Sequence, residues 1–313
     1  MGVSYVLGVD GGGTKTAFEL ADRQGASLAL HTDSGISYRQ HGLNKVLETL
    51  LRGRNICARQ SGVSLQDITH VCIGLPCWGE SPQGDMTISG MIEQAFSPAK
   101  VRVVNDTEAA WAGSLSLQPG INVVSGTGSI AYGRDHTGRS ARCGGWSEAF
   151  GDEGSCFWAG IKTMELFSKQ SDGRLPRSAL YDIVRRALSL KDDMDFIDIM
   201  HREYIPFRDK TAQLQILLDE AASAGDRSAA GVYRTAAGEL ALLVKGARNG
   251  LSLFNPFPVS YSGGMFKAGN LILPHFRQSV KELGGALREP EHPPVHGAVL
   301  LALELPGASL PNH

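Results

Sequence analysis

The sequence lacks long apolar runs, a signal-type start and an excess of either charge. None of its apolar stretches approaches the ~20 residues of a membrane span. The N-terminus has no basic region followed by an apolar segment of the kind that directs secretion. With 30 Lys and Arg against 32 Asp and Glu, the net charge of −2 leaves no footprint for nucleic acid or an anionic membrane. We therefore expect a soluble cytoplasmic protein with neither of these partners.

Cysteine is also scarce. The five cysteines are Cys57, Cys72, Cys77, Cys143 and Cys156. Their number is odd, no CxxC pair occurs, and no histidine pair has matching spacing, which argues against a disulfide framework and a structural zinc site. Reduced thiols, as in cytoplasmic proteins, are expected.

What the chain does contain is enough apolar sequence for two domains. Its 313 residues are 42% hydrophobic. The first part predicts three strands and then alternating helices and strands, in the order β-β-β-α-β-α-β-α. The strands are expected near 6–9, 17–21, 27–31, 71–75 and 101–104, and the helices over 43–61, 84–96 and 107–117. This pattern is typical of a mixed-sheet α/β layer.

Residues 121–134 repeat the plan of residues 5–21, an apolar strand, a glycine turn and a returning strand. This echo favours a duplicated α/β lobe. Later elements are expected as helices at 155–168, 176–190, 210–224, 228–252, 267–283 and 295–305, and a strand at 259–262. We therefore predict an N-terminal domain, 1–117, and a C-terminal domain, 118–313, with extra helices.

The opening hairpin carries the first chemical signal. Its strand ends at Asp10 and is followed by Gly11-Gly12-Gly13-Thr14-Lys15. Glycine permits φ > 0 and close ligand approach, and successive N–H groups in such a turn suit a phosphate. A Walker A loop would need Lys directly after the last glycine, and a Rossmann fingerprint would need a helix next. The alternative interpretation is a tight hairpin turn that binds no ligand.

Three further pieces stand at strand ends, where open α/β sheets bind ligands. They are Asp106, the turn Ser125-Gly-Thr-Gly-Ser129, and Ser262-Gly-Gly-Met265. Two glycine turns could bind a polyphosphate from both sides, and an acid could face a substrate hydroxyl. Such an arrangement is typical of phosphoryl transfer, which depends mainly on positioning and charge stabilisation. Each piece also has a simpler interpretation. Asp106 could cap the following helix, the second turn imitates a dinucleotide fingerprint without its helix, and Gly263-Gly264 could be a plain turn.

Taken together, these motifs resemble the N-acetylglucosamine kinase family. The motifs are Asp10-Gly-Gly-Gly-Thr, Asn105-Asp106, Ser125-Gly-Thr-Gly-Ser, Gly144-Gly-Trp146, Gly151-Asp-Glu-Gly-Ser155 and Ser262-Gly-Gly-Met. That family lies in the BadF/BadG/BcrA/BcrD ATPase-like branch of the superfamily of sugar kinases, heat-shock chaperone ATPases and actin. The resemblance spans roughly residues 5 to 305 and is most specific over 125–155.

The resemblance implies an α/β fold of two ribonuclease-H-like (actin-like ATPase) lobes with mixed β-sheets around an interlobe cleft for ATP, Mg²⁺ and an amino sugar. It implies that Asp106 is the general base for the sugar 6-hydroxyl and that Asp10 holds Mg²⁺ through water. Nucleotide contacts are expected from Gly12, Gly13, Thr14, Lys15, Gly126, Thr127, Gly128, Gly263 and Gly264. Sugar contacts are expected from Asn105, Asp106, Thr127, Gly145, Trp146 and Asp152. Core packing of Trp146 and helix capping by Asp152 are the simpler alternatives.

One position departs from the family. An asparagine commonly follows the early Gly-x-Ser and helps to hold the sugar, whereas here Tyr38 follows Gly35-Ile36-Ser37. Arg39 or Gln40 could substitute for it, and a cationic Arg39 would favour a sugar with a carboxylate, such as a muramic acid derivative. The plain alternative is a surface loop.

The resemblance therefore favours phosphorylation of N-acetylglucosamine to its 6-phosphate, with glucosamine or N-acetylmuramic acid as alternative acceptors and a homodimer as an assembly it allows. An ATPase activator of a radical enzyme would need cysteines for an iron–sulfur cluster, and Cys143 and Cys156 do not resemble that motif. A sugar-sensing repressor would need a helix-turn-helix segment before the first strand.

Overall fold

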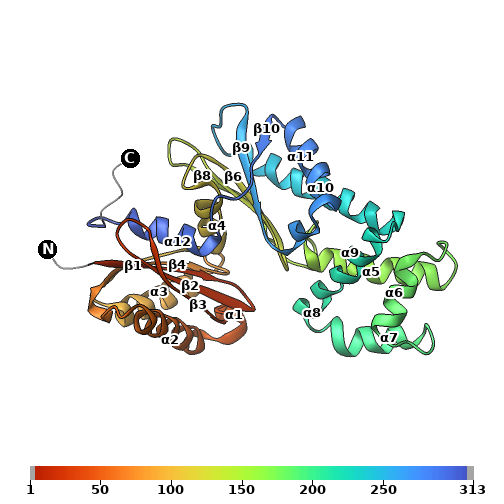
Figure 1. Cartoon of the computed structure of the whole chain (residues 1–313), viewed down its shortest axis with the longest axis horizontal. Helices are drawn as coiled ribbons and strands as arrows, with labels where there is room; N and C mark the ends of the chain where they lie inside the picture. The colour runs from red at the N-terminus through yellow and green to blue at the C-terminus, as the bar shows by residue number, and fades with distance from the viewer. Residues whose placement is uncertain (1–3, 309–313) are drawn as a thin grey trace. The chain divides into compact units, whose positions relative to one another are not determined.

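The computed structural model describes residues 4–308, which form two units. The first unit contains the described residues up to Gln118 together with those from Glu289 onward, and the second runs from Pro119 to Arg288. Each unit is built on its own five-stranded mixed sheet with helices packed against it (Figure 1). The predicted α/β class with two mixed-sheet lobes is confirmed.

The sheet of the first unit has the order β3-β2-β1-β4-β5. Its strands are β1 (Tyr5–Gly11), β2 (Lys15–Ala21), β3 (Ser27–Ser34), β4 (Ile68–Leu75) and β5 (Lys100–Asn105). The first three pair antiparallel, whereas β4 and β5 run parallel to β1. The helices are α1 (Tyr38–His41), α2 (Leu43–Ser61), η1 (Leu65–Asp67), α3 (Pro82–Phe96), α4 (Asp106–Leu115) and α12 (Pro294–Leu303).

Strand alternation decides which helix covers which face of this sheet. Phe18 on β2 is fully buried and lies under α2, where a Cβ on Gly53 would come within 2.3 Å of the Phe18 ring. Gly8 and Glu19 are paired on the opposite face, toward α12. There a Cβ on Gly8 would meet the Val299 backbone nitrogen at 2.6 Å, so glycine allows the helix to approach the strand closely.

The second sheet has the order β10-β9-β6-β7-β8. Its strands are β6 (Gly120–Ser125), β7 (Ser129–Arg134), β8 (Ser140–Gly144), β9 (Phe257–Ser262) and β10 (Gly285–Leu287). Three consecutive antiparallel strands are again followed by two parallel ones. The two sheets thus share one topology, which confirms the duplicated lobe; β8 and β10 are strands that the sequence pattern does not predict.

The helices of the second unit differ in detail from those expected. They are α5 (Cys156–Ser171), α6 (Ala179–Ala187), α7 (Asp195–Ile199), the π-helix η2 (Met200–Tyr204), α8 (Arg208–Gln213), α9 (Gln215–Ser223), α10 (Arg227–Arg248), the 3₁₀ segment η3 (Gly264–Leu271) and α11 (Leu273–Glu282). The helix expected at 210–224 is divided at Leu214 into α8 and α9. The helix expected at 267–283 is interrupted because Gly269 has φ +52°.

The predicted domain boundaries need one correction. The predicted second domain, 118–313, includes α12, but this helix belongs to the first unit, where it packs on β1, β4 and α4 (Figure 1). Most of α12 is buried and apolar, and Gly297 lets it lie against α4. The remaining predicted residues of that segment, 309–313, lie outside the described residues.

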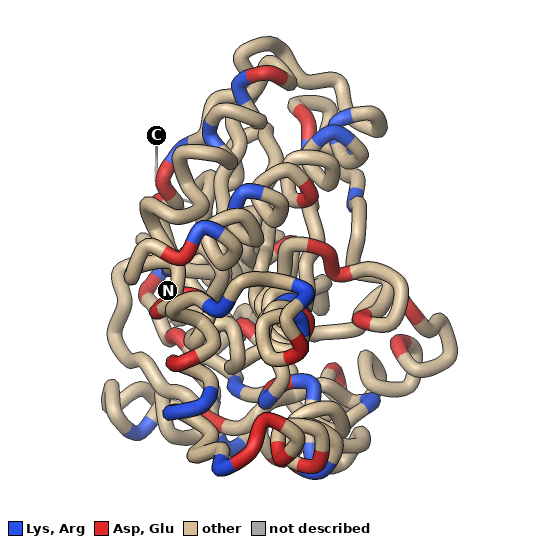
Figure 2. The backbone as a smooth tube through the Cα atoms, turned by 90° about the vertical axis from the view of Figure 1, so that its right-hand side faces the viewer, with Lys and Arg blue, Asp and Glu red and all other residues tan. Residues whose placement is uncertain are grey.

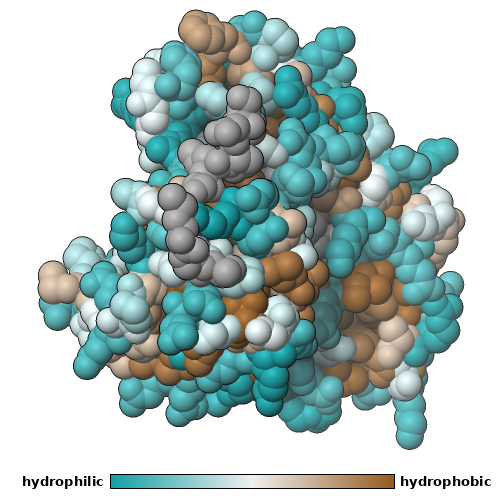
Figure 3. Space-filling model, turned by 60° about the vertical axis from the view of Figure 1, so that its left-hand side comes forward, coloured by the Kyte–Doolittle hydropathy of each residue, from teal (hydrophilic) through white to brown (hydrophobic). Residues whose placement is uncertain are grey.

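Charges of both signs are interspersed along the chain trace in Figure 2. The face in Figure 3 is mainly hydrophilic with separate apolar patches. Among residues 4–308, no helix is long and apolar enough to cross a membrane.

The contact between α12 and α4 can be tested by adding a single methyl group. A Cβ at position 297 would lie 2.0 Å from the Ala109 carbonyl oxygen, so Gly297→Ala must displace one of the two helices. We expect a loss of about 1–3 kcal/mol in the free energy of unfolding, measured by denaturant titration. Gly90→Ala on α3 is the control, because nothing lies within 4 Å of its added Cβ. Equal stability of both variants would contradict the packing described here.

Candidate active site

The turn between β1 and β2 is closed by backbone hydrogen bonds. The N–H of Gly12 donates to the Lys15 carbonyl at 2.9 Å, so this amide is already used, and Gly13, Thr14 and Lys15 remain as the predicted phosphate contacts. The N–H groups of Gly35 and Ile36 donate to Thr14 and Gly12 at 3.1 and 3.0 Å. A Cβ on Gly35 would lie 2.0 Å from the Gly13 oxygen, so only glycine fits beside the turn.

Helix α1 supports this turn. His41 Nε2 donates to the Gly13 carbonyl at 2.9 Å. The Tyr38 hydroxyl donates to Asp85 Oδ1 at 3.1 Å, and burial together with Asp85 raises the pKa of Tyr38. Arg39 forms an ion pair with Glu80 at 3.1 Å. Tyr38–His41 is therefore a short helix with specific contacts, and the surface-loop alternative is wrong.

Two carboxylates of the first unit interact electrostatically. Asp10 lies near the end of β1, and Asp106 is the first residue of α4 after β5. The pKa of Asp10 is raised to about 7, first by burial and then by the Asp106 charge, whereas Lys15 lowers it. Repulsion between two neighbouring carboxylates favours the retention of a proton by one of them, here Asp10, and a nearby cation would reduce that repulsion.

Asn105, and not Asp106, is the N-cap of α4. Its Oδ1 accepts from the Thr107 N–H at 3.1 Å and the Thr107 hydroxyl at 2.6 Å, while its Nδ2 donates to the Trp78 carbonyl at 2.8 Å. The Thr107 N–H also approaches Asp106 Oδ1 at 3.0 Å. Asn105 is thus used to fix the start of the helix that presents Asp106.

The second turn, 125–129, is joined along its length to the segment 152–156. Its first glycine again closes it, because the Gly126 N–H donates to the Gly128 carbonyl at 2.9 Å. The hydroxyls of Ser125 and Ser129 donate to the carbonyls of Gly154 and Glu153 at 2.8 and 2.7 Å, and the Cys156 N–H donates to the Gly126 carbonyl at 2.8 Å. The predicted phosphate turn and the predicted sugar loop therefore form one hydrogen-bonded assembly.

Asp152 is buried within this assembly in a backbone conformation uncommon for a residue with a side chain. Its φ is +59°, only 4% of its surface is exposed, and its Oδ1 accepts from the Ser129 N–H at 3.0 Å. Its Oδ2 accepts from Arg208 of α8. Asp152 does not cap α5, because that role belongs to Ser155, which accepts from the Trp158 N–H at 3.1 Å.

Sequence reasoning missed Arg208. No motif surrounds it, and it stands more than fifty positions from its partner Asp152. Only the fold brings the two together.

The other predicted residues of the second unit lie close to this assembly or project from it. The Gly145 N–H donates to the Ser129 carbonyl at 2.9 Å. Trp146, which follows, is 78% exposed, so core packing is not its role. Gly263 has φ +105°, and a Cβ there would lie 2.3 Å from the Ser125 oxygen, while one on Gly264 would lie 3.3 Å from Cys156 Sγ.

No cluster of three or more His, Cys, Asp or Glu side chains in residues 4–308 is arranged to hold a metal ion. Mg²⁺ is usually held by one or two carboxylates together with water and substrate phosphates. Asp10 and Asp106 supply oxygen donors of that kind.

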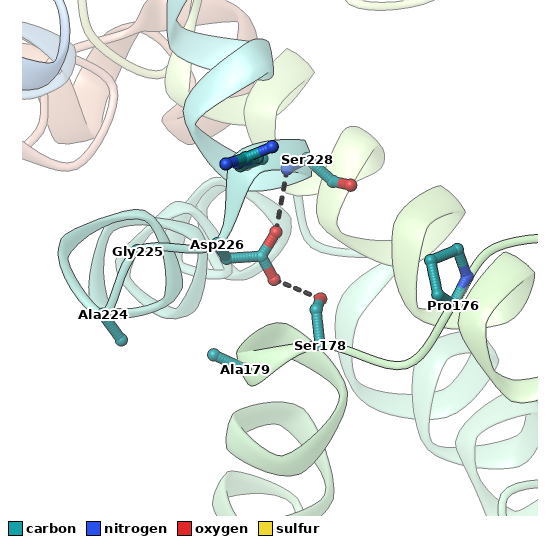
Figure 4. Close-up of a pocket in the computed structure, with 8 residues that line it drawn as sticks. Pro176, Ser178, Ala179, Ala224, Gly225, Asp226 and Ser228 are labelled. Atoms are coloured by element: carbon teal, nitrogen blue, oxygen red, sulfur yellow. Dashed lines mark hydrogen bonds between the residues drawn. The ribbon is translucent and has the colours of Figure 1, made fainter.

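A cavity of about 360 Å³ also lies at the start of α6 and α10, next to Asp226. The Asp226 carboxylate accepts from the Ser178 hydroxyl and from the Ser228 N–H at 2.9 Å (Figure 4). It also accepts from the N–H groups of Leu180 and Ala229 at 3.0 and 3.1 Å. One carboxylate thus already satisfies the starts of two helices, which explains this acid structurally.

Two sheets of one topology, each with a glycine turn after its first strand, define a two-unit α/β protein. The chain belongs to the BadF/BadG/BcrA/BcrD ATPase family, which residues 7–302 match. The predicted family branch is confirmed.

Individual relatives are more specific. The chain is 34% identical over 281 residues to the N-acetylmuramic acid/N-acetylglucosamine kinase of Clostridium acetobutylicum, covering 88% of this chain and 90% of the relative. It is 26% identical over 315 residues to the N-acetyl-D-glucosamine kinase of Dictyostelium discoideum, with 97% and 99% covered. Among solved structures, a provisionally named N-acetylglucosamine kinase from Chromobacterium violaceum has a TM-score of 0.77 at 26% identity, covering 96% of this chain and 99% of that one.

The Asp10 environment predicts a pH-dependent stability. Because the pKa of Asp10 is about 7 in the folded state and 3.8 ordinarily, the folded state retains a proton that the unfolded chain loses. This contribution lowers the free energy of unfolding as pH rises from about 4 to 7 and remains unfavourable above that range. Asp10→Asn should therefore be more stable than wild type at pH 8, by up to about 4 kcal/mol at ~1.4 kcal/mol per pKa unit, and similar near pH 4.

Denaturant titrations at both pH values measure this difference without added metal or nucleotide. Asp209→Asn, at an exposed acid, is the control. An Asp10→Asn variant that is less stable than wild type at pH 8 would show that the Asp10 carboxylate stabilises the fold and would contradict the assignment.

Proposed function

We propose that this chain is an ATP-dependent kinase that transfers a phosphoryl group to the 6-hydroxyl of an amino sugar, with N-acetylglucosamine as the first candidate. One observation supports this most directly. The turn 125–129 is hydrogen-bonded along its length to the loop that carries Asp152, which unites a phosphate-type turn with a sugar-type loop in the second unit. Membership of an ATPase family and the amino-sugar kinase names of the relatives support the same reaction.

In this proposal, both glycine turns bind the nucleotide phosphates. Because Gly12 and Gly126 use their N–H groups to close the turns, contacts to phosphate oxygens fall to Gly13, Thr14, Lys15, Thr127 and Gly128. Gly263 and Gly264 lie against the adenosine, because glycines without side chains let the adenine ring approach the backbone closely. Asp10 would hold Mg²⁺ through water, and the ion would supply positive charge to the phosphates.

Asp106 is proposed as the general base. It lies at the start of α4, where the helix N-terminus favours the charged carboxylate, and Asn105 fixes the first turn of that helix. A carboxylate oriented in this way can accept the proton of the sugar hydroxyl as the hydroxyl attacks phosphorus.

The sugar is proposed to bind to Asp106, Asn105, Thr127, Gly145, Trp146 and Asp152. Trp146 offers an exposed aromatic face, which suits the apolar side of a pyranose ring. Asp152 and Asn105 already use most of their hydrogen-bonding groups within the protein, so their part is to shape the site as well as to touch the sugar.

A carboxylate-bearing sugar is a second candidate acceptor. Arg39 stands near the position at which the family commonly has asparagine, its side chain is 50% exposed, and its partner Glu80 is a surface acid. A lactyl carboxylate could compete with Glu80 for this guanidinium. The name of the C. acetobutylicum relative includes N-acetylmuramic acid, which supports testing this sugar beside N-acetylglucosamine.

A cytoplasmic location is proposed for the same protein. ATP as phosphoryl donor and five cysteines without disulfides are consistent with a reducing compartment.

The reaction is tested by measuring ADP release with glucosamine, N-acetylglucosamine, N-acetylmannosamine, N-acetylmuramic acid, glucose and no sugar. We expect release that depends on an amino sugar. Asp106→Asn should lower kcat by about 10²–10⁴-fold, because general-base catalysis contributes on this scale, while ATP affinity persists. Glu93→Gln, at an exposed acid on α3, is the matched control. ADP release that ignores sugar would contradict the kinase proposal, and near-normal kcat in Asp106→Asn would remove the base.

A further inference from the structure

Arg208 lies where the two functional segments of the second unit meet. Its Nη2 donates to the Asp152 carboxylate, and its Nε lies 3.5 Å from Glu148 Oε2. A Cβ on Gly128 would lie 2.7 Å from the same Nη2 and 2.9 Å from both Asp152 oxygens. The guanidinium therefore rests against the turn 125–129 and the segment 145–155 at the same time, and only a glycine at 128 leaves room for it.

The side chains of Asp152 and Arg208 are buried to different extents. The Asp152 side chain is 3% exposed, whereas that of Arg208 is 36% exposed. A buried carboxylate needs hydrogen-bond partners for its oxygens, and here Arg208 and the Ser129 N–H provide them from two directions. Contacts on both oxygens fix the orientation of the carboxylate.

We infer that Arg208 is a positioning residue of the acceptor site, which holds the Asp152 carboxylate in a fixed orientation beside the turn 125–129. The inference rests on the proposed sugar-binding role of Asp152. Arg208 acts through Asp152, so its loss should weaken sugar binding more than nucleotide binding.

The position of α8 does not depend on Arg208. Thr211 of the same helix donates from its hydroxyl to the Tyr204 carbonyl at 2.9 Å, and its own carbonyl packs so closely on α5 that a Cβ at Gly160 would lie 2.0 Å away. Thr211 and Ala212 are buried. A substitution at 208 should therefore leave the helix in place and change mainly the Asp152 environment.

Steady-state kinetics of Arg208→Gln test this role. We expect the KM for N-acetylglucosamine to rise at least about tenfold, the KM for ATP to stay within about twofold, and Tm to change by a few degrees at most. Arg208→Lys keeps the charge but not the planar fork, so it should recover part of the loss. Arg202→Gln removes an exposed arginine of η2 with surface ion pairs, and it should resemble wild type.

Each outcome decides a separate question. An unchanged or lowered sugar KM in Arg208→Gln overturns the inference, and a lowered value would mean that Arg208 competes with sugar for Asp152. A parallel loss of sugar affinity, ATP affinity and Tm would show a structural role and also overturn it. If Arg208→Gln does not fold, the same comparison is made with Arg208→Lys, where an unchanged sugar KM overturns it. A wild-type protein that phosphorylates none of the sugars overturns the proposed function, and the inference with it.

Discussion

Close backbone approach at glycine is the constraint on which both units depend. At Gly35, Gly263 and Gly297, the space for a Cβ is taken by a carbonyl oxygen 2.0 to 2.3 Å away. The first two contacts hold the chain against the glycine turns, and the third seats α12 on α4. Because no side chain can be accommodated at such distances, the same physical requirement shapes the candidate site and the core.

The duplicated topology gives two turns with different electrostatic surroundings. In the first unit, burial and the nearby Asp106 charge raise the pKa of Asp10. In the second unit, the buried acid Asp152 already has its cation, Arg208. The two units therefore place their buried acids in different electrostatic surroundings on scaffolds of the same topology.

Local pattern predicted those elements that have a periodic apolar face. Helix α2 begins and ends at the expected residues, Leu43 and Ser61, because its leucines recur at helical spacing. Strand β8 (Ser140–Gly144) escaped prediction because its sequence, SARCG, is only five residues long and contains no β-branched or aromatic residue. It is recognised as a strand by its pairing with β7. Helix α12 was expected as a helix but assigned to the wrong unit, since an apolar face does not reveal which sheet it covers. The glycine turns, Asp10 and Asp106 were singled out because they stand at strand ends, and Gly145, Trp146 and Asp152 were singled out by the family resemblance. Arg208 becomes evident only when distant segments are folded together.

The return of α12 to the first sheet makes the second unit an insertion within the first. During synthesis, the ribosome completes the whole of the second unit before it releases the helix that covers β1 and β4. The inserted half can therefore reach its native state while the enclosing half still exposes the apolar face of a sheet. Until the last helix emerges, that face is a surface on which chaperones can act and at which truncated chains aggregate.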